Sequence, residues 1–195
     1  MNVALVILHA DPAKGGAETY TVDLARALAD RGHAVSVLAA SFADAVDPRV
    51  GRVSLPYAGA TRVGRYASFL AGLDAHLAAV GMRLGATAAG GRGVATRAGG
   101  YDVVHAMLPV RRCDLYHPHA GIAAEAVAGG HLKHASPVRR AGARLANQLN
   151  RKRQRFAAVE RELLTAGGDG AAGTPPLVIC LSDYIKATVR RHYPL

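Results

Sequence analysis

Apolar and polar residues follow one another along the chain in a pattern that predicts alternating strands and helices. Residues 3–8 form a continuous apolar run of strand length, as in a strand covered on both faces. Within residues 21–31, four apolar residues recur at helical spacing and form one face: Val22, Ala25, Leu28 and Ala29. Gly32 lies where a helix C-cap is expected, and residues 33–39 return to strand character. This order predicts a βαβ unit with parallel strands.

The rest of the chain continues the alternation less regularly. Further strands are predicted at residues 50–55, 102–106, 114–116 and 177–181. Further helices are predicted at residues 66–80, 138–164 and 183–192, the last with Ser182 as its N-cap. We expect residues 81–100, rich in glycine and alanine, to form a flexible insertion. The pattern predicts an α/β fold, a Rossmann-like parallel sheet with helices on both faces, in a single domain over residues 1–195.

Ligands of such sheets bind at the carboxyl ends of the strands, so the residues that follow each strand are candidates for a site. Gly15 and Gly16 follow the first strand and open the first helix, where backbone N–H groups and the helix dipole favour an anion. The chain has neither GxGxxG nor a P-loop, and Glu18 in the first helical turn would oppose a phosphate placed directly there. Two interpretations stay open, a plain turn and a loop that approaches a ligand.

Two histidines flank a proline in "YHPHAG", residues 116–121, directly after a short predicted strand. Because the residue before Pro118 is held extended, we expect the rings of His117 and His119 to point in different directions. A metal site would need a third ligand, for which only Asp114 and His105 are conceivable, and we expect no metal. A neutral imidazole that hydrogen-bonds a sugar hydroxyl or phosphate is better supported. Partly exposed loop histidines are the remaining alternative.

Composition narrows the class of partner. The 195 residues carry 24 Lys and Arg against 14 Asp and Glu, a net charge of +10, which favours anionic ligands. The two cysteines are far apart and outside any zinc-ligand spacing, as in a cytosolic domain with reduced thiols. The apolar start "MNVALVILHA" is too short to span a bilayer, so any membrane attachment is expected to be peripheral.

Basic residues concentrate in residues 139–155, which hold seven cations and no acid: Arg139, Arg140, Arg144, Arg151, Lys152, Arg153 and Arg155. As a helix, this run is either a solvated face or a contact for anionic phosphate on a lipid or lipopolysaccharide. Nucleic acid is the rival partner, but the chain lacks the aromatic interleaving and the motifs of nucleic-acid-binding modules. No catalytic triad or carboxylate pair is recognisable, and Glu160 and Glu162 are expected at the surface.

Four segments together resemble a known family. "GGAETYTVDLARALADRGHAVSVLA" is similar to the amino-terminal domain of GT-B glycosyltransferases of family 4. "YDVVHAM", "CDLYHPHAG" and "VICLSDYIKATVRRHY" follow in the order of the branch similar to lipopolysaccharide core glucosyltransferases. The resemblance covers nearly the whole chain except residues 81–100.

This resemblance implies a retaining transfer of a hexose from a nucleotide-sugar such as UDP-glucose to a lipopolysaccharide-type or lipid-linked acceptor, with no cofactor. It places Gly15 and Gly16 near the phosphate and sugar of the donor, and His117 at a strand end in the active site. Some relatives carry an aspartate where this chain has Ala120, so His119 is our candidate catalytic residue in its place. Ser182 matches the position where the chain of the family heads toward the second domain.

The resemblance also implies a second, donor-binding domain that this sequence does not include. The chain is then expected to be a truncated or split product that works with a separately encoded donor domain. The alternative is a non-catalytic remnant or a binding module for anionic glycolipid. Either form is expected in the cytoplasm, with peripheral attachment to the inner face of the cytoplasmic membrane.

Overall fold

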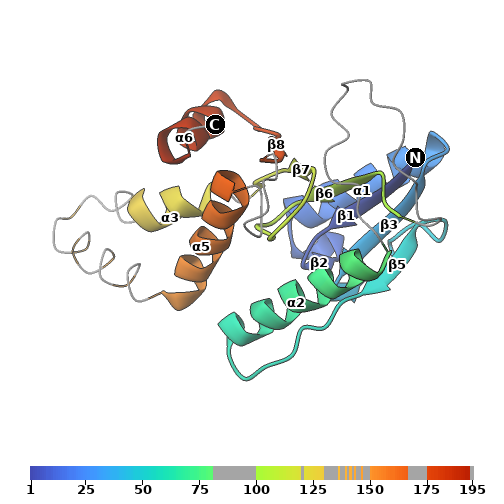
Figure 1. The fold of residues 1–195 in the computed structure, drawn as a ribbon, viewed down its shortest axis with the longest axis horizontal. Coiled ribbons are helices and arrows are strands. Elements are labelled where there is room, and N and C mark those ends of the chain that lie inside the picture. The colour runs from blue at the N-terminus through green and yellow to red at the C-terminus, as the bar shows by residue number, and fades with distance from the viewer. Residues whose placement is uncertain are drawn as a thin grey trace.

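Six parallel strands form the central sheet of the computed structural model, which describes residues 1–80, 100–119, 121–129, 150–166 and 175–193 with single positions between 136 and 146 (Figure 1). In sheet order the strands are β5 (Gly51–Ser54), β3 (Ala34–Ala39), β1 (Asn2–Val6), β6 (Val103–Ala106), β7 (Leu115–Tyr116) and β8 (Leu177–Val178). Every neighbouring pair is parallel. Taken in chain order this is the doubly wound 3-2-1-4-5-6 arrangement, and it confirms the predicted α/β parallel sheet.

Five helices accompany the sheet within the described residues. They are α1 (Gly16–Asp30), α2 (Arg62–Val80), α3 (Ala123–Gly129), α5 (Arg151–Ala166) and α6 (Asp183–His192). A short 3-10 helix, η1 (Pro12–Lys14), precedes α1, and a small parallel sheet pairs β2 (His9–Ala10) with β4 (Ser41–Phe42). In Figure 1, α3, α5 and α6 gather beside β7 and β8, whereas α1 and α2 lie over the β1–β3 half of the sheet.

Alternate residues of β1 enter two separate hydrophobic cores, because successive side chains of a strand point to opposite faces. Val3 and Leu5 belong to the core that α1 covers, and Ala4 and Val6 to the core that α2 and α5 cover. β1 is therefore buried on both faces, which explains its continuous apolar run.

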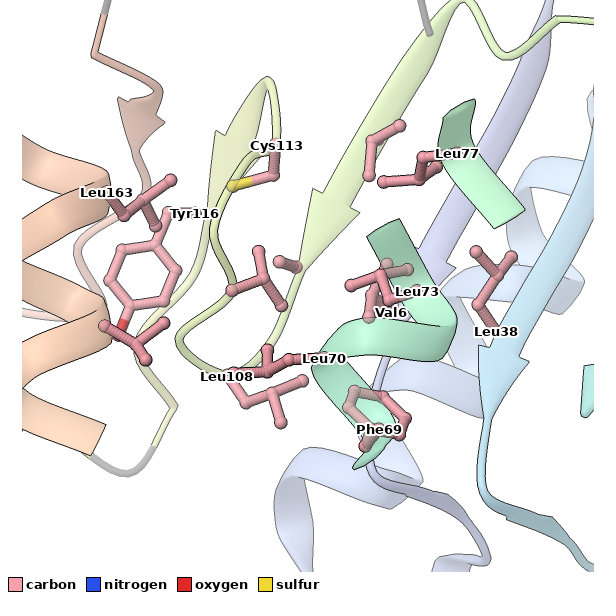
Figure 2. Close-up of a cluster of buried hydrophobic side chains, with 14 of the residues drawn as sticks. Val6, Leu38, Phe69, Leu70, Leu73, Leu77, Leu108, Cys113, Tyr116 and Leu163 are labelled. Atoms are coloured by element: carbon pink, nitrogen blue, oxygen red, sulfur yellow. The ribbon is translucent and has the colours of Figure 1, made fainter. Parts of the chain in front are cut away.

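The larger core runs from α2 across the sheet to α5. Leu70 and Leu73 of α2 lie over Val6 of β1, and Leu163 of α5 lies beside Tyr116 of β7 (Figure 2). All five side chains are at most 1 % exposed. Burial of one such leucine contributes about 1.5–3 kcal/mol, so this core is what holds α2 and α5 against the sheet.

Two predicted helix ends are confirmed by their hydrogen bonds. Gly32 has a φ of +78°, and its N–H and that of His33 donate to the carbonyls of Ala29 (2.9 Å) and Leu28 (3.1 Å). This left-handed turn ends α1. At α6 the Ser182 hydroxyl accepts a hydrogen bond from the N–H of Ile185 at 3.3 Å, as an N-cap does.

Other predicted elements differ in extent. The helix expected over residues 138–164 is observed as α5 from Arg151 onward, and most of residues 138–149 lie outside the described part of the chain. Of the expected insertion at 81–100, residues 81–99 also lie outside it. The strand expected at 177–181 is shortened to Leu177–Val178. Neither α3 nor the small β2–β4 sheet was predicted.

The expectation that Glu160 lies at the surface is wrong. It is fully buried, and its carboxylate accepts hydrogen bonds from the hydroxyls of Tyr116 (2.6 Å) and Tyr193 (3.0 Å) and from the N–H of Ala124 (3.2 Å). The physical reason is helical spacing, because Glu160 is four residues from Leu164 on the buried stripe of α5. Glu162 is exposed, as expected.

Candidate active site at the carboxyl ends of β1, β6 and β7

Three chain segments come together at the carboxyl ends of the central strands β1, β6 and β7. β1 lies between β3 and β6, and the strand order reverses its direction at β1. The segments that leave β1, β6 and β7 therefore emerge side by side, at the position where doubly wound sheets bind ligands. Histidines and the start of α1 come together there.

Three histidine rings lie next to one another at these strand ends. His105 in β6 and His117 directly after β7 have ring centroids 5.7 Å apart and nearly parallel planes, at 14°. The rings of His117 and His119 are closer, with centroids 4.0 Å apart. This contact corrects the expectation that His117 and His119 point in different directions. The N–H of His119 donates to the carbonyl of His117 at 2.8 Å, so the chain folds back around Pro118 and brings the two rings together.

Tyr20 of α1 completes the cluster from the other side. Its ring meets the edge of His117 at a centroid distance of 5.1 Å and lies 4.6 Å from His119. Tyr20 is 37 % exposed, so it forms the solvent side of the cluster. Tyr20 is not among the site residues predicted from the sequence. The signal was present, because Tyr20 is an aromatic residue on α1 outside the apolar stripe.

The histidines are held uncharged at neutral pH. Burial is the main cause that lowers the pKa values of His105 and His117 to about 4, and the neighbouring histidines add to it. Burial also lowers the pKa of His119, while the Glu18 carboxylate acts in the opposite direction. Each ring therefore carries one N–H donor and one acceptor nitrogen.

Several of these nitrogens have no hydrogen-bond partner within the described protein. They are Nε2 of His105, both ring nitrogens of His117 and Nε2 of His119, and all are buried. A buried polar atom without a partner costs free energy, which a ligand hydroxyl or phosphate oxygen would recover. The cluster can therefore offer several hydrogen bonds to a polar ligand without placing a charge beside it.

A metal ligand set is not formed by the residues that the structure describes: no three His, Cys, Asp or Glu side chains are arranged to hold an ion. The Asp114 carboxylate accepts the N–H of Val104 at 2.8 Å and is thereby tied to the start of β6.

Gly15 and Gly16 stand at the start of α1, beside the histidine cluster. Gly15 is the N-cap, and no side chain caps the helix. A Cβ added at Gly16 would meet nothing within 4 Å, whereas one at Gly15 would lie 3.0 Å from Oε2 of Glu18. Gly16 thus faces open space, and Gly15 borders the carboxylate that acts on His119.

Ser182 lies apart from the three histidines in sheet order. It follows β8, the edge strand beyond β7, and its hydroxyl is engaged as the N-cap of α6. The structure therefore gives Ser182 a local structural role, and its place in a ligand cleft remains a prediction.

The seven basic residues are only partly described. Arg139, Arg151 and Arg153 are exposed, and Lys152 and Arg155 are half-buried. Arg140 and Arg144, like Ala120, lie outside the described residues. Among the described helices, none combines the length and the apolar character needed to cross a bilayer.

Comparisons with known proteins match this architecture. A family model described as Glycosyltransferase Family 4 matches residues 14–195. The crystal structure of WaaG, a glycosyltransferase involved in lipopolysaccharide biosynthesis, superposes with a TM-score of 0.71 at 21 % identity. That match covers 98 % of this chain and 42 % of WaaG, so the chain spans less than half of its structural relative. No curated protein sequence matches the chain significantly. Because the family model covers nearly all of the sequence, the chain belongs to glycosyltransferase family 4.

Proposed function

We propose that this chain is the acceptor-side half of a retaining glycosyltransferase that transfers a hexose from a nucleotide-sugar to a lipopolysaccharide-type or lipid-linked acceptor. Membership of family 4 implies a sugar donor and an acceptor. The observation that carries the proposal is the uncharged cluster of His105, His117 and His119 at the reversal point of the sheet. Its unpartnered ring nitrogens fit the hydroxyl groups of a sugar.

In the reaction the bond between the anomeric carbon and the diphosphate of the donor breaks, and that carbon bonds to a hydroxyl oxygen of the acceptor. The proton of this hydroxyl leaves with the diphosphate. We assign to His119 the contact with the transferred hexose, in place of the carboxylate that some relatives have at position 120. His117 and His105 hold His119 from behind, while the loop at Gly15 and Gly16 approaches the donor.

Under this proposal residues 1–195 form one domain that lines one wall of the cleft, with an insertion at residues 81–100. Most contacts with the donor nucleotide then come from a second domain, supplied by a longer or separate chain. The chain alone is accordingly expected to bind donor weakly.

The direct test is sugar transfer by the chain together with a donor domain of the same family supplied in trans, assayed with UDP- and GDP-hexoses. His119→Ala is expected to abolish transfer. His33→Ala is the matched control, because His33 precedes β3 at the opposite end of the strands from the cluster. Transfer that survives His119→Ala and His117→Ala would exclude the proposed role of the cluster, and no transfer with any folded pairing would contradict the enzyme function.

A second function has one observation in its favour, the exposed arginines of the acid-free run, Arg139, Arg151 and Arg153. They suit a module that binds anionic glycolipid, or the peripheral attachment of a cytoplasmic enzyme to the inner face of the membrane. Co-sedimentation with lipopolysaccharide-containing vesicles tests it. Salt-sensitive binding without any sugar transfer would favour the binding module over the enzyme.

A further inference from the structure

A second cluster of polar side chains lies at the same edge of the sheet, on the side of α2 and α5. His9 follows β1, Tyr57 follows β5, and their rings meet edge to face with centroids 5.7 Å apart. Arg65, in the first turn of α2, places its guanidinium 5.6 Å from the centre of the Tyr57 ring. Residues that are far apart in sequence are thus assembled around one spot.

Arg65 has an unfilled hydrogen-bonding capacity there. Its side chain is half-buried, and its Nε is buried without a partner in the described protein. A guanidinium nitrogen withdrawn from water normally finds an acceptor, and carboxylate or phosphate oxygens match its planar fork. The ring of Tyr57 stabilises the cation but accepts no hydrogen bond in the guanidinium plane.

Lys152 of α5 lies one helical turn before Phe156, the side chain through which α5 packs against α2. Phe156 stacks on Tyr66, the neighbour of Arg65, with centroids 4.2 Å apart. The Lys152 ammonium lies 5.3 Å from the centre of the Phe156 ring, on the preceding helical turn. Burial lowers the pKa of His9, and the cations of Lys14 and Lys152 act in the same direction, so Lys152 is within electrostatic reach of His9.

His9 itself is held in a fixed orientation. Its Nδ1 lies 2.8 Å from the Ser41 hydroxyl, which leaves Nε2 as the ring nitrogen available to a ligand. Two acids also act on His9, and among the described residues neither forms an ion pair with Arg65 or Lys152. Asp11 pairs with Lys14 at 3.8 Å, and the Glu18 carboxylate acts to raise the pKa values of both His9 and His119.

We propose that His9, Arg65 and Lys152 form a binding site for an anionic oxygen group, phosphate or carboxylate, carried by the acceptor. That the anion belongs to the acceptor rests on the proposed function. The anion site itself does not depend on sugar transfer. These side chains are distinct from those of the histidine cluster. The charged group of the acceptor and the transferred hexose would therefore bind to different residues at the carboxyl ends of the strands.

The test is titration of the 195-residue chain with inorganic phosphate, followed by NMR at the Arg65 Nε–H and the His9 ring. Both signals are expected to shift saturably, and Arg65→Gln or Lys152→Gln should weaken binding by about tenfold each. Arg161→Gln and Arg26→Gln are matched controls, because these exposed arginines lie on α5 and α1 away from the cluster. Arg65→Lys keeps the positive charge but not the planar guanidinium group. It controls for a loss of folding and should bind phosphate more weakly than the native chain.

Three sugars test whether the site recognises the anionic group or the sugar ring. Glucose 6-phosphate and glucuronate should shift the same signals as phosphate, while methyl glucoside should not. If the control variants weaken phosphate binding as much as Arg65→Gln does, binding depends only on the net charge of the chain. That result would overturn the proposal. Shifts confined to His117, His119 and Gly16 would also overturn it, by placing the anion at the histidine cluster. Phosphate binding that depends on Arg65 without any sugar transfer would retain the site and reject the enzyme function.

Discussion

The Tyr116 hydroxyl donates a 2.6 Å hydrogen bond to the buried carboxylate of Glu160. The same carboxylate also accepts the Tyr193 hydroxyl and the N–H of Ala124, so one side chain ties β7, α6 and the start of α3 to α5. Tyr116 immediately precedes His117, and its position in β7 sets where the histidine turn begins. The buried carboxylate therefore helps to fix the end of β7, from which the candidate site begins.

Glu160→Gln tests this bond. The amide cannot accept three hydrogen bonds with one oxygen, so we expect a loss of about 1–3 kcal/mol in the free energy of unfolding, measured by urea denaturation. Glu162→Gln, two residues away and exposed, should change it by less than about 0.5 kcal/mol. Equal effects of the two variants would show that the network contributes nothing.

Stability should depend on pH through the histidine cluster. His105 and His117 have pKa values of about 4 in the folded chain, below the usual 6.5, so the unfolded chain binds more protons between these values. Their contribution to the free energy of unfolding is complete above pH 6.5 and is lost as the pH falls toward 4. For one such histidine the loss between pH 7 and pH 5 is about 2 kcal/mol.

Urea denaturation at both pH values measures this difference. His117→Asn should reduce the pH dependence, and His33→Asn, which removes a histidine outside the cluster, should preserve it. A native protein whose stability is flat from pH 7 to pH 5 would contradict the buried, neutral state of the rings.

Tyr20→Ala should open the solvent side of the cluster. In the native chain burial lowers the pKa of His119. Without the Tyr20 ring water reaches His119, so its pKa should rise toward 6.5. An NMR titration of the histidine ring protons measures the change. Tyr184→Ala removes an equally large ring that is 62 % exposed on α6 and should leave the titration of His119 unchanged.

Gly16→Val should separate function from folding. A Cβ at Gly16 meets nothing within 4 Å, so the free energy of unfolding should fall by less than about 1 kcal/mol. Transfer in the paired assay should be abolished, because the branched side chain enters the space where the donor is proposed to approach. Gly16→Ala should show a smaller loss. Unfolding of the isolated Gly16→Val chain would instead favour the plain turn.

Periodicity was a sound guide to the elements that bury one continuous face. β1, α1 and β3 were predicted because their apolar residues recur at strand or helix spacing, and Gly32 and Ser182 marked helix ends by their chemistry. The β2–β4 sheet escaped prediction because two-residue strands have no period to detect.

The candidate site was only half visible in the sequence. His117 and His119 stood out as a motif, but their ring contact depends on a turn around Pro118 that the local sequence does not specify. Tyr20 joins them from another element, and that meeting is decided by how α1 packs on the sheet. Glu160 was predicted at the surface from its own polarity, but its place on the buried stripe of α5 brings it to Tyr116 and Tyr193 from other elements.

The position of β1 at the centre of the sheet also sets an order of assembly. The strand is synthesised first and pairs with β3 about thirty residues later, but its other neighbour, β6, is about a hundred residues away, as in the pair Val3 and Val103. Closing that long loop is slow relative to forming the local βαβ unit. The β5–β3–β1 half can therefore form on the ribosome while His105, His117 and His119 are still unmade, and the binding edge is completed only when the second half docks.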